Sequence, residues 1–166
     1  MQASILETRR WHWPDEPACA ESARALAGRC GIDDAFIELH GPLGAGKTTF
    51  VRHLLAALGV EGRVKSPTYT LLESYRAAAA HGGFAIGHFD FYRFEDPQEW
   101  EDAGFREVFA GPGLKLVEWP DKAATLLPPC DLRIAIAPRD DGDARAVRVE
   151  ALSARGALLL PTERPA

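Results

Sequence analysis

Several residue types are scarce or missing in this sequence of 166 residues, and each absence narrows the range of functions. There is no asparagine, a single methionine and only three cysteines, Cys19, Cys30 and Cys130. Their odd number and the lack of a C-x-x-C pair argue against a disulfide scaffold and against a zinc site. We therefore expect reduced thiols in a cytoplasmic protein.

Long apolar runs and a surplus of basic residues are also missing. No stretch approaches the roughly 20 apolar residues that a membrane-spanning helix needs, so we expect no contact with a membrane. Residues 1–13 contain no apolar segment followed by a cleavage site, so we expect no signal peptide. The chain has 19 basic and 24 acidic residues, a net charge of −5, which argues against tight binding of nucleic acid by this chain alone.

The length suits one domain, and the order of apolar patterns indicates its class. The first half reads as helix, strand, loop and helix, with helical apolar spacing over residues 16–29 and 50–58 around a short apolar run at 35–40. The second half is mostly strand-like, and a hairpin signature at 139–143 joins its last two strands. We predict an α/β protein with a P-loop NTPase-like mixed sheet, a parallel core with antiparallel edge strands, flanked by helices. Residues 1–166 would form a single P-loop ATPase domain, with a loose tail from about residue 155.

Residues 41–48, GPLGAGKT, match the phosphate-binding pattern G-x-x-x-x-G-K-[ST], between an apolar run and a helical pattern. Glycines let several backbone N–H groups point at one phosphate, and the following helix directs its positive end at the same place. Lys47 would bridge the β- and γ-phosphates, and the Thr48 hydroxyl would bind Mg²⁺. The residues expected to cradle the nucleotide are Gly41, Leu43, Gly44, Ala45, Gly46, Lys47 and Thr48.

Two acidic residues stand near the ends of expected strands, where α/β sheets bind their ligands. Asp90 lies within the run at 84–94, and Glu118 follows the apolar residues 114–117. Hydrolysis of a nucleotide needs a carboxylate on the Mg²⁺ side and a group that orients water. We predict a metal-side role for both acids, with Glu118 as the stronger candidate for positioning water.

Two further features could complete such a site. The segment 66–68, Ser-Pro-Thr, lies beyond the helix that follows the phosphate-binding loop, in a region that often forms a nucleotide-sensing loop in P-loop proteins. Thr68 could reach the γ-phosphate or the metal. Arg93 could neutralise charge that develops during hydrolysis. Each feature also has a simple structural explanation, a Ser-Pro turn and a surface arginine respectively.

The missing asparagine also bears on which nucleotide is bound. Guanine recognition generally uses an N-K-x-D motif, which this chain lacks, and the L-S-G-G-Q signature of ABC-type ATPases is absent too. ATP with Mg²⁺ is therefore the expected ligand. A P-loop small-molecule kinase and a nucleotide-sensing module without turnover stay open as alternatives, although a kinase usually has an arginine-rich lid and the segment after this helix is short.

Four motifs in a fixed order resemble the bacterial TsaE (YjeE) family: GPLGAGKTTF at 41–50, SPTY at 66–69, HFDFYR at 88–93 and VEWP at 117–120. The resemblance covers roughly residues 15–150. It implies a small ATPase that works with TsaB and TsaD to make threonylcarbamoyladenosine beside the anticodon of tRNA, its turnover stimulated by these partners. Contact with tRNA would be indirect, through the complex.

The resemblance also implies roles for individual residues. Lys47, Asp90 and Glu118 would serve catalysis, with Thr48, Asp90 and Glu118 on the metal side and Thr49 and Thr68 at the nucleotide. Residues implied to couple nucleotide state to partners are Ser66, Pro67, His88, Tyr92, Arg93 and Trp119. Where the family usually has threonine near the start of the first helix, this chain has Cys19, so no adenine contact from that helix is carried over.

Overall fold

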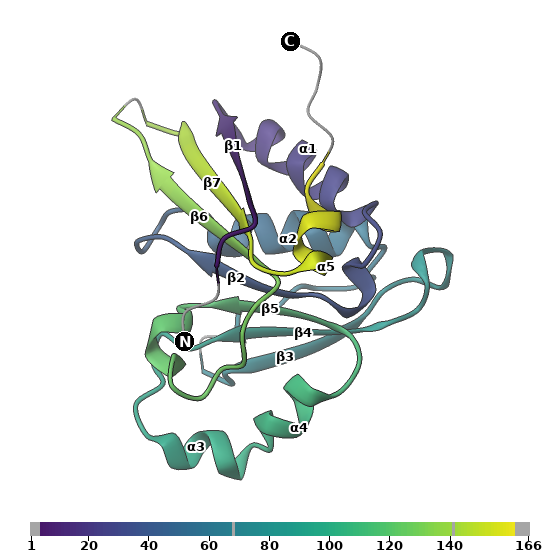
Figure 1. Cartoon of the computed structure of the whole chain (residues 1–166), viewed down its shortest axis with the longest axis vertical. Coiled ribbons are helices and arrows are strands. Elements are labelled where there is room, and N and C mark those ends of the chain that lie inside the picture. Colours follow the sequence, from purple (N-terminus) through teal and green to yellow (C-terminus); the bar gives the residue numbers. More distant parts are fainter. Residues whose placement is uncertain (1–3, 68, 141, 162–166) are drawn as a thin grey trace.

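A computed structural model describes residues 4–67, 69–140 and 142–161. One mixed sheet of seven strands, in the order β1-β7-β6-β2-β5-β4-β3, runs through this part of the chain (Figure 1). The strands are β1 (Glu7–Trp13), β2 (Phe36–His40), β3 (Leu72–Arg76), β4 (Ala85–Asp90), β5 (Leu114–Glu118), β6 (Leu132–Pro138) and β7 (Arg145–Ala151). The predicted mixed sheet is confirmed.

The parallel part of the sheet lies at its centre. Strand β2 pairs in parallel with β6 on one side and with β5 on the other, and β5 pairs in parallel with β4. The antiparallel strands β7 and β1 extend one edge, and antiparallel β3 closes the other. Because the central strands are parallel, the carboxyl ends of β2, β4 and β5 lie next to one another at the same end of the sheet.

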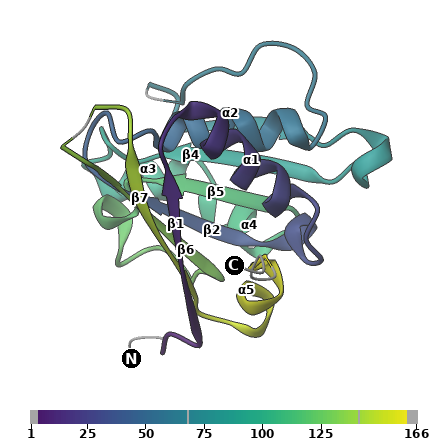
Figure 2. The same ribbon diagram turned by 90° about the horizontal axis from the view of Figure 1, so that it is seen from above.

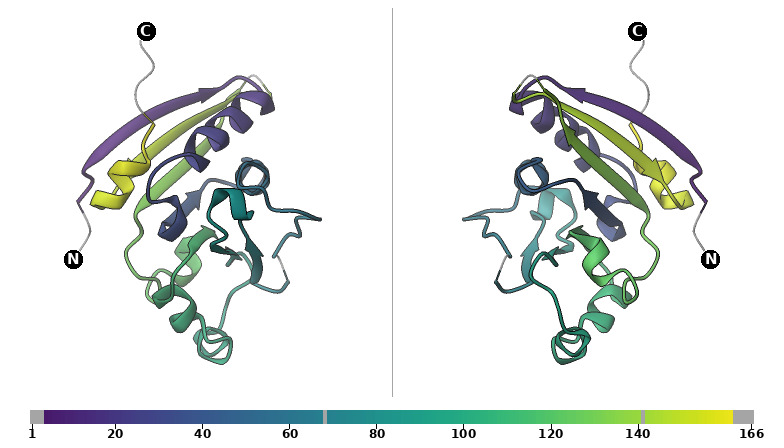
Figure 3. Two further views of the ribbon diagram at one scale, coloured as in Figure 1. Left: turned by 90° about the vertical axis from the view of Figure 1, so that its right-hand side faces the viewer. Right: turned by 90° about the vertical axis from the view of Figure 1, so that its left-hand side faces the viewer.

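The helices cover both faces of the sheet. They are α1 (Glu16–Ala27), α2 (Lys47–Ala57), α3 (Pro97–Asp102), α4 (Phe105–Ala110) and α5 (Ala154–Leu159). Helices α1 and α2 pack together on one face, which we call the α2 face (Figures 2 and 3). Their apolar side chains join those of β2, β5 and β6 in the larger core, and α3 and α4 cover a second, aromatic-rich core (Figure 1). No described helix has the length and apolar character needed to cross a bilayer.

The ends of several elements follow their capping residues. Asp15 accepts a hydrogen bond from the Ala18 N–H at the start of α1, and Asp96 does the same for Gln98 at the start of α3, where Pro97 takes the first helical position. Gly59, which has a φ of 74°, lies just beyond the end of α2.

The expected loose tail from about residue 155 is wrong for the described residues up to 161. Ser153 caps α5 by accepting from the Gly156 N–H at 3.0 Å and also bonds Asp131, while Leu159 and Leu160 are buried in the larger core. The tail is ordered because these contacts fix a helix that is too short to be stable alone. Strand β1 and helix α4 also exist where the sequence analysis predicted no element.

Candidate functional site

The predicted phosphate-binding loop lies between the end of β2 and the start of α2. Gly41, Gly44 and Gly46 have φ values of 149°, 80° and 107°, which side chains rarely allow. A Cβ added to Gly41 would lie only 2.5 Å from the Ile136 carbonyl oxygen of β6. The loop therefore needs its glycines for both conformation and space, as the pattern indicates.

An arginine on strand β7, two strands away from β2 in the sheet, holds this loop in place. The Arg145 Nε of β7 donates to the Ala45 carbonyl oxygen at 2.8 Å, and Ala45 is itself buried. A second guanidinium nitrogen, Nη1, donates to the carbonyls of Gly142 and Ala144 at 2.9 and 3.0 Å. The loop is thus tied to the hairpin between β6 and β7, about 100 residues away in the sequence.

Lys47 is enclosed although it is charged. Its Nζ donates to the Gly41 carbonyl and lies 3.5 Å from the centroid of the Trp119 ring, a cation–π contact. Burial lowers the pKa of this amine, while the nearby carboxylates of Glu118 and Asp90 act in the opposite direction. The Lys47 amine is therefore held beside the loop by the Gly41 carbonyl and the Trp119 ring.

A chain of hydrogen bonds runs from the start of α2 into the sheet. The Thr48 hydroxyl lies 2.9 and 3.1 Å from the two carboxylate oxygens of Glu118. On its other side Glu118 Oε2 lies 2.6 Å from Nε2 of His88 on β4, and both side chains are almost completely buried. The strand that carries Glu118 is the direct neighbour of the strand that leads into the loop, which explains why Thr48 reaches this acid.

Asp90 stands beside Glu118 across the pairing of β4 with β5. Alternation along both strands puts these two acids and His88 on the α2 face. The Tyr92 backbone N–H donates to Asp90 Oδ1 at 2.9 Å, which favours the ionised acid, yet burial has the larger effect and raises the pKa of this carboxyl above its ordinary value.

These groups line an open cleft of about 520 Å³. Two aromatic contacts stand on its rim: the rings of Tyr92 and Trp119 lie 5.0 Å apart, and Arg93 lies 5.0 Å from the centroid of the exposed Tyr69 ring. The lining residues are Leu43, Gly44, Ala45, Gly46, Lys47, Thr48, Thr49, Ser66, Asp90, Tyr92, Arg93, Glu118 and Trp119. Most of the site residues proposed from the sequence therefore come together.

Among the described residues, three of the proposed site residues, Gly41, Pro67 and His88, do not line this cleft. Pro67 is buried, and Thr68 lies outside the described residues. The implied place of His88 on a partner-facing surface is wrong, because its side chain is completely buried between β4 and β5. Alternation along β4 points it inward, in the same direction as Asp90.

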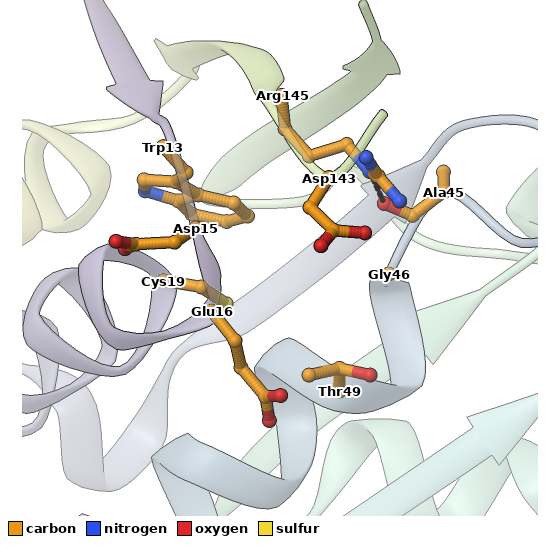
Figure 4. A pocket seen from close by; sticks show the side chains of 9 residues that line it. All are labelled: Trp13, Asp15, Glu16, Cys19, Ala45, Gly46, Thr49, Asp143 and Arg145. Atoms are coloured by element: carbon orange, nitrogen blue, oxygen red, sulfur yellow. Dashed lines mark hydrogen bonds between the residues drawn. The ribbon is translucent and has the colours of Figure 1, made fainter. Parts of the chain in front are cut away.

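A second, smaller pocket of about 220 Å³ adjoins the other side of the loop (Figure 4). Ala45, Gly46 and Thr49 line both pockets, so the two lie on either side of these loop residues. Cys19 of α1, which the sequence analysis named, also lines this pocket. Sequence reasoning missed the remaining lining residues, which come from the β1–α1 junction and the β6–β7 hairpin: Trp13, Asp15, Glu16, Asp143 and Arg145. The alternating tryptophans of β1 are the one signal that could have indicated this strand.

The oxygen donors of the cleft suit Mg²⁺. Thr48, Asp90 and Glu118 offer a hydroxyl and two carboxylates, the hard ligands that this ion prefers. Within residues 4–67, 69–140 and 142–161, no group of three or more His, Cys, Asp or Glu side chains could hold a metal ion by itself. That fits an ion that shares its coordination with phosphates and water rather than one held by a cage of side chains.

Comparisons with known proteins all point to one family. The model of the family described as threonylcarbamoyl adenosine biosynthesis protein TsaE matches residues 13–147. The chain is 46% identical over 105 residues to the tRNA threonylcarbamoyladenosine biosynthesis protein TsaE of Haemophilus influenzae, spanning 63% of this chain and 64% of that protein. It is 39% identical over 123 residues to the protein of the same name from Bacillus subtilis, spanning 74% and 73%.

A solved structure shows the same fold. The crystal structure of YdiB from Bacillus subtilis superposes with a TM-score of 0.73 at 27% identity and covers 95% of this chain and 94% of that one. The likeness therefore extends over nearly the whole length of both proteins.

Proposed function

This chain belongs to the TsaE family, and from that premise we propose that it is an ATP-binding and ATP-hydrolysing subunit required for threonylcarbamoyladenosine modification of tRNA. We further propose that it acts with TsaB-like and TsaD-like proteins and meets tRNA through their complex. The observation that carries the ATPase part is the hydrogen bond from Thr48 to Glu118 at the mouth of a glycine-rich loop. That pairing joins the expected metal ligand of the loop to an acid on the neighbouring strand.

The two pockets suggest how ATP would lie. Its phosphates would rest against the backbone of residues 41–48, with the Lys47 amine released from Gly41 to contact the β- and γ-phosphates. The nucleoside would extend past Gly46 and Thr49 into the second pocket, where the Trp13 indole offers an apolar wall. Mg²⁺, when bound, would neutralise phosphate charge and orient the γ-phosphate.

The two acids would divide the remaining work. Glu118 accepts from the Thr48 hydroxyl, which supports a place for it on the metal side. Asp90 makes no such bond to Thr48 and its pKa is raised by burial, which makes its carboxylate a better proton acceptor for an attacking water. This division differs from the sequence-based expectation that Glu118 positions the water.

The test is Mg²⁺-dependent ATP turnover by the purified chain, alone and with TsaB and TsaD added. We expect turnover that appears or rises with those partners. Turnover that ignores them, or that needs a small-molecule acceptor, would instead favour a kinase. ATP binding with no turnover under any of these conditions would leave a nucleotide-sensing module.

Two variants locate the activity in the cleft. Lys47→Ala should lose most ATP binding because the β- and γ-phosphates lose their charged partner. Glu118→Ala should keep most ATP binding, which the loop and Lys47 supply, and lose Mg²⁺-dependent hydrolysis because the metal side loses its carboxylate. Lys122→Ala, which removes an exposed lysine outside the cleft, is the matched control and should behave like the unmodified chain.

A further inference from the structure

His88 is a completely buried polar residue that the proposed catalysis does not use. Its side chain has no exposed surface and does not line either pocket beside the loop. It cannot therefore touch ATP or a partner protein directly. Its polar contact is with Glu118, 2.6 Å from Nε2 to Oε2.

The surroundings of the ring indicate which nitrogen carries the proton. Nδ1 is buried and has no hydrogen-bond partner among the described residues. An N–H at Nδ1 would leave a buried donor unsatisfied, and a bare Nε2 would face carboxylate oxygens with no proton to donate. A proton on Nε2 avoids both costs and gives a charge-assisted hydrogen bond.

The Glu118 carboxylate thus has two hydrogen-bond partners, Thr48 and His88, and they differ in their access to the cleft. Thr48 faces the cleft and is shared with any bound ligand, because it lines the space where phosphates and metal would lie. His88 lies on the same face of the neighbouring strand β4, and its ring makes no other hydrogen bond among the described residues. The carboxylate would otherwise have rotamers that turn it away from Thr48.

We propose that His88 is a positioning residue: its Nε2–H fixes the Glu118 carboxylate so that it stays directed at Thr48 and the reacting end of ATP. This rests on the proposed function for its effect on turnover. The hydrogen bond itself exists in the protein without ATP and can be tested separately. Partners that orient metal-side ligands in this way typically contribute a factor of about 10–100 to activity.

The first test reads the protonated nitrogen by NMR of the ¹⁵N-histidine-labelled full chain without nucleotide at pH 7. We expect the His88 ring to carry a proton on Nε2, with a coupling that disappears in a His88→Gln sample used for assignment. A ring whose only proton is on Nδ1 would overturn the proposal, since Nε2 could then donate nothing to Glu118. This result does not depend on any variant being active.

The second test separates orientation from packing. His88→Leu fills the same space with an apolar side chain that cannot donate to Glu118. It should lower kcat for ATP about 10–100-fold, with KM for ATP changed less than about twofold. His88→Gln offers an amide N–H to Glu118 and should recover most of that loss. His12→Leu, an exposed histidine on β1, should match the unmodified chain.

The outcomes distinguish this inference from the proposed function. If the unmodified chain shows no ATP turnover, either alone or with TsaB and TsaD, the ATPase proposal is wrong. The NMR result would still show whether His88 Nε2 carries the proton that it donates to Glu118. Turnover unaffected by His88→Leu, a change in KM alone, or a His88→Gln variant as slow as His88→Leu would overturn the positioning role while leaving the ATPase intact. Urea unfolding of each variant shows whether it is folded at the assay temperature.

Discussion

Helix α5 offers a direct test of whether the last part of the chain belongs to the core. Leu159 and its neighbour Leu158 are adjacent in the same helix, but Leu159 is fully buried whereas Leu158 is 53% exposed. The perturbation is Leu159→Ala, which removes buried methyl groups from the larger core. Leu158→Ala removes the same atoms from the surface and is the matched control.

The magnitude follows from burial. Replacing a fully buried leucine by alanine costs about 2–5 kcal/mol, of which we take about 3 kcal/mol because α5 lies at the margin of the core and can relax. The entropy of unfolding is about 2.1 cal/mol/K per residue, or about 350 cal/mol/K for a chain of this length. The expected fall in Tm is therefore about 9 °C for Leu159→Ala, against less than about 1.5 °C for Leu158→Ala.

Differential scanning calorimetry of the three proteins at one concentration measures both shifts. Equal changes in Tm for the two variants would refute the reasoning. Both leucines would then contribute the same amount to stability, which is not expected of a helix that buries one side and exposes the other. A large shift for Leu158→Ala alone would mean that α5 docks by its other side.

Three further changes test other parts of the structure. Arg145→Met should weaken ATP binding about tenfold in titration calorimetry, because a charged donor to the Ala45 carbonyl contributes about 1.5–3 kcal/mol to holding the loop. Gly156→Ala should lower the free energy of unfolding in urea by about 3 kcal/mol, since the new Cβ would lie 1.9 Å from a backbone oxygen. The free energy of unfolding should also fall as the pH rises from 9 toward 12: burial raises the pKa of the Cys130 thiol from 9.0 to about 12, so the unfolded thiol ionises first. Urea unfolding at pH 8, 9 and 10 measures this loss, and Cys130→Ala should reduce it.

Each of these changes has a control. Arg148→Met removes an exposed arginine from the same strand and should leave ATP binding unchanged. Gly28→Ala, at a glycine with a φ of −88° where the added Cβ would meet no atom closer than 3.8 Å, should cost less than Gly156→Ala. Cys30 is exposed, so Cys30→Ala should leave the pH dependence of stability as it is. A variant that merely equals its control would contradict the contact assigned to that residue.

The phosphate-binding loop could be predicted because its requirements are local. Positive φ values and a close approach to β6 demand glycine at fixed places, and the lysine and threonine must follow at once to reach the same phosphates. Strand β2 and helix α2 are direct neighbours of the loop, so their patterns appear in one short window. Asp90 and Glu118 could be predicted for the same reason, because each ends an apolar run.

Strand β1 and the second pocket depend instead on residues far apart in the sequence. The segment Glu7–Trp13 is mostly polar and becomes a strand by pairing with β7, for example Trp11 with Val147. Only that pairing brings Trp13 and Arg145 to the same side of the loop. Short local windows carry no signal for such contacts, because strand formation here is decided by tertiary partners.

The roles of the two acids show most clearly what the sequence could not decide. Asp90 and Glu118 both end apolar runs, and their local patterns treat them alike. What separates them is the order of strands: β5 lies directly beside β2, whereas β4 lies one strand further from the loop. Glu118 therefore accepts from the Thr48 hydroxyl, whereas Asp90 faces the cleft and accepts from the Tyr92 backbone N–H. Because strand order is set by packing across the whole sheet, local patterns could not show which acid Thr48 reaches, and the sequence-based choice of Glu118 for the water changed once the fold was known.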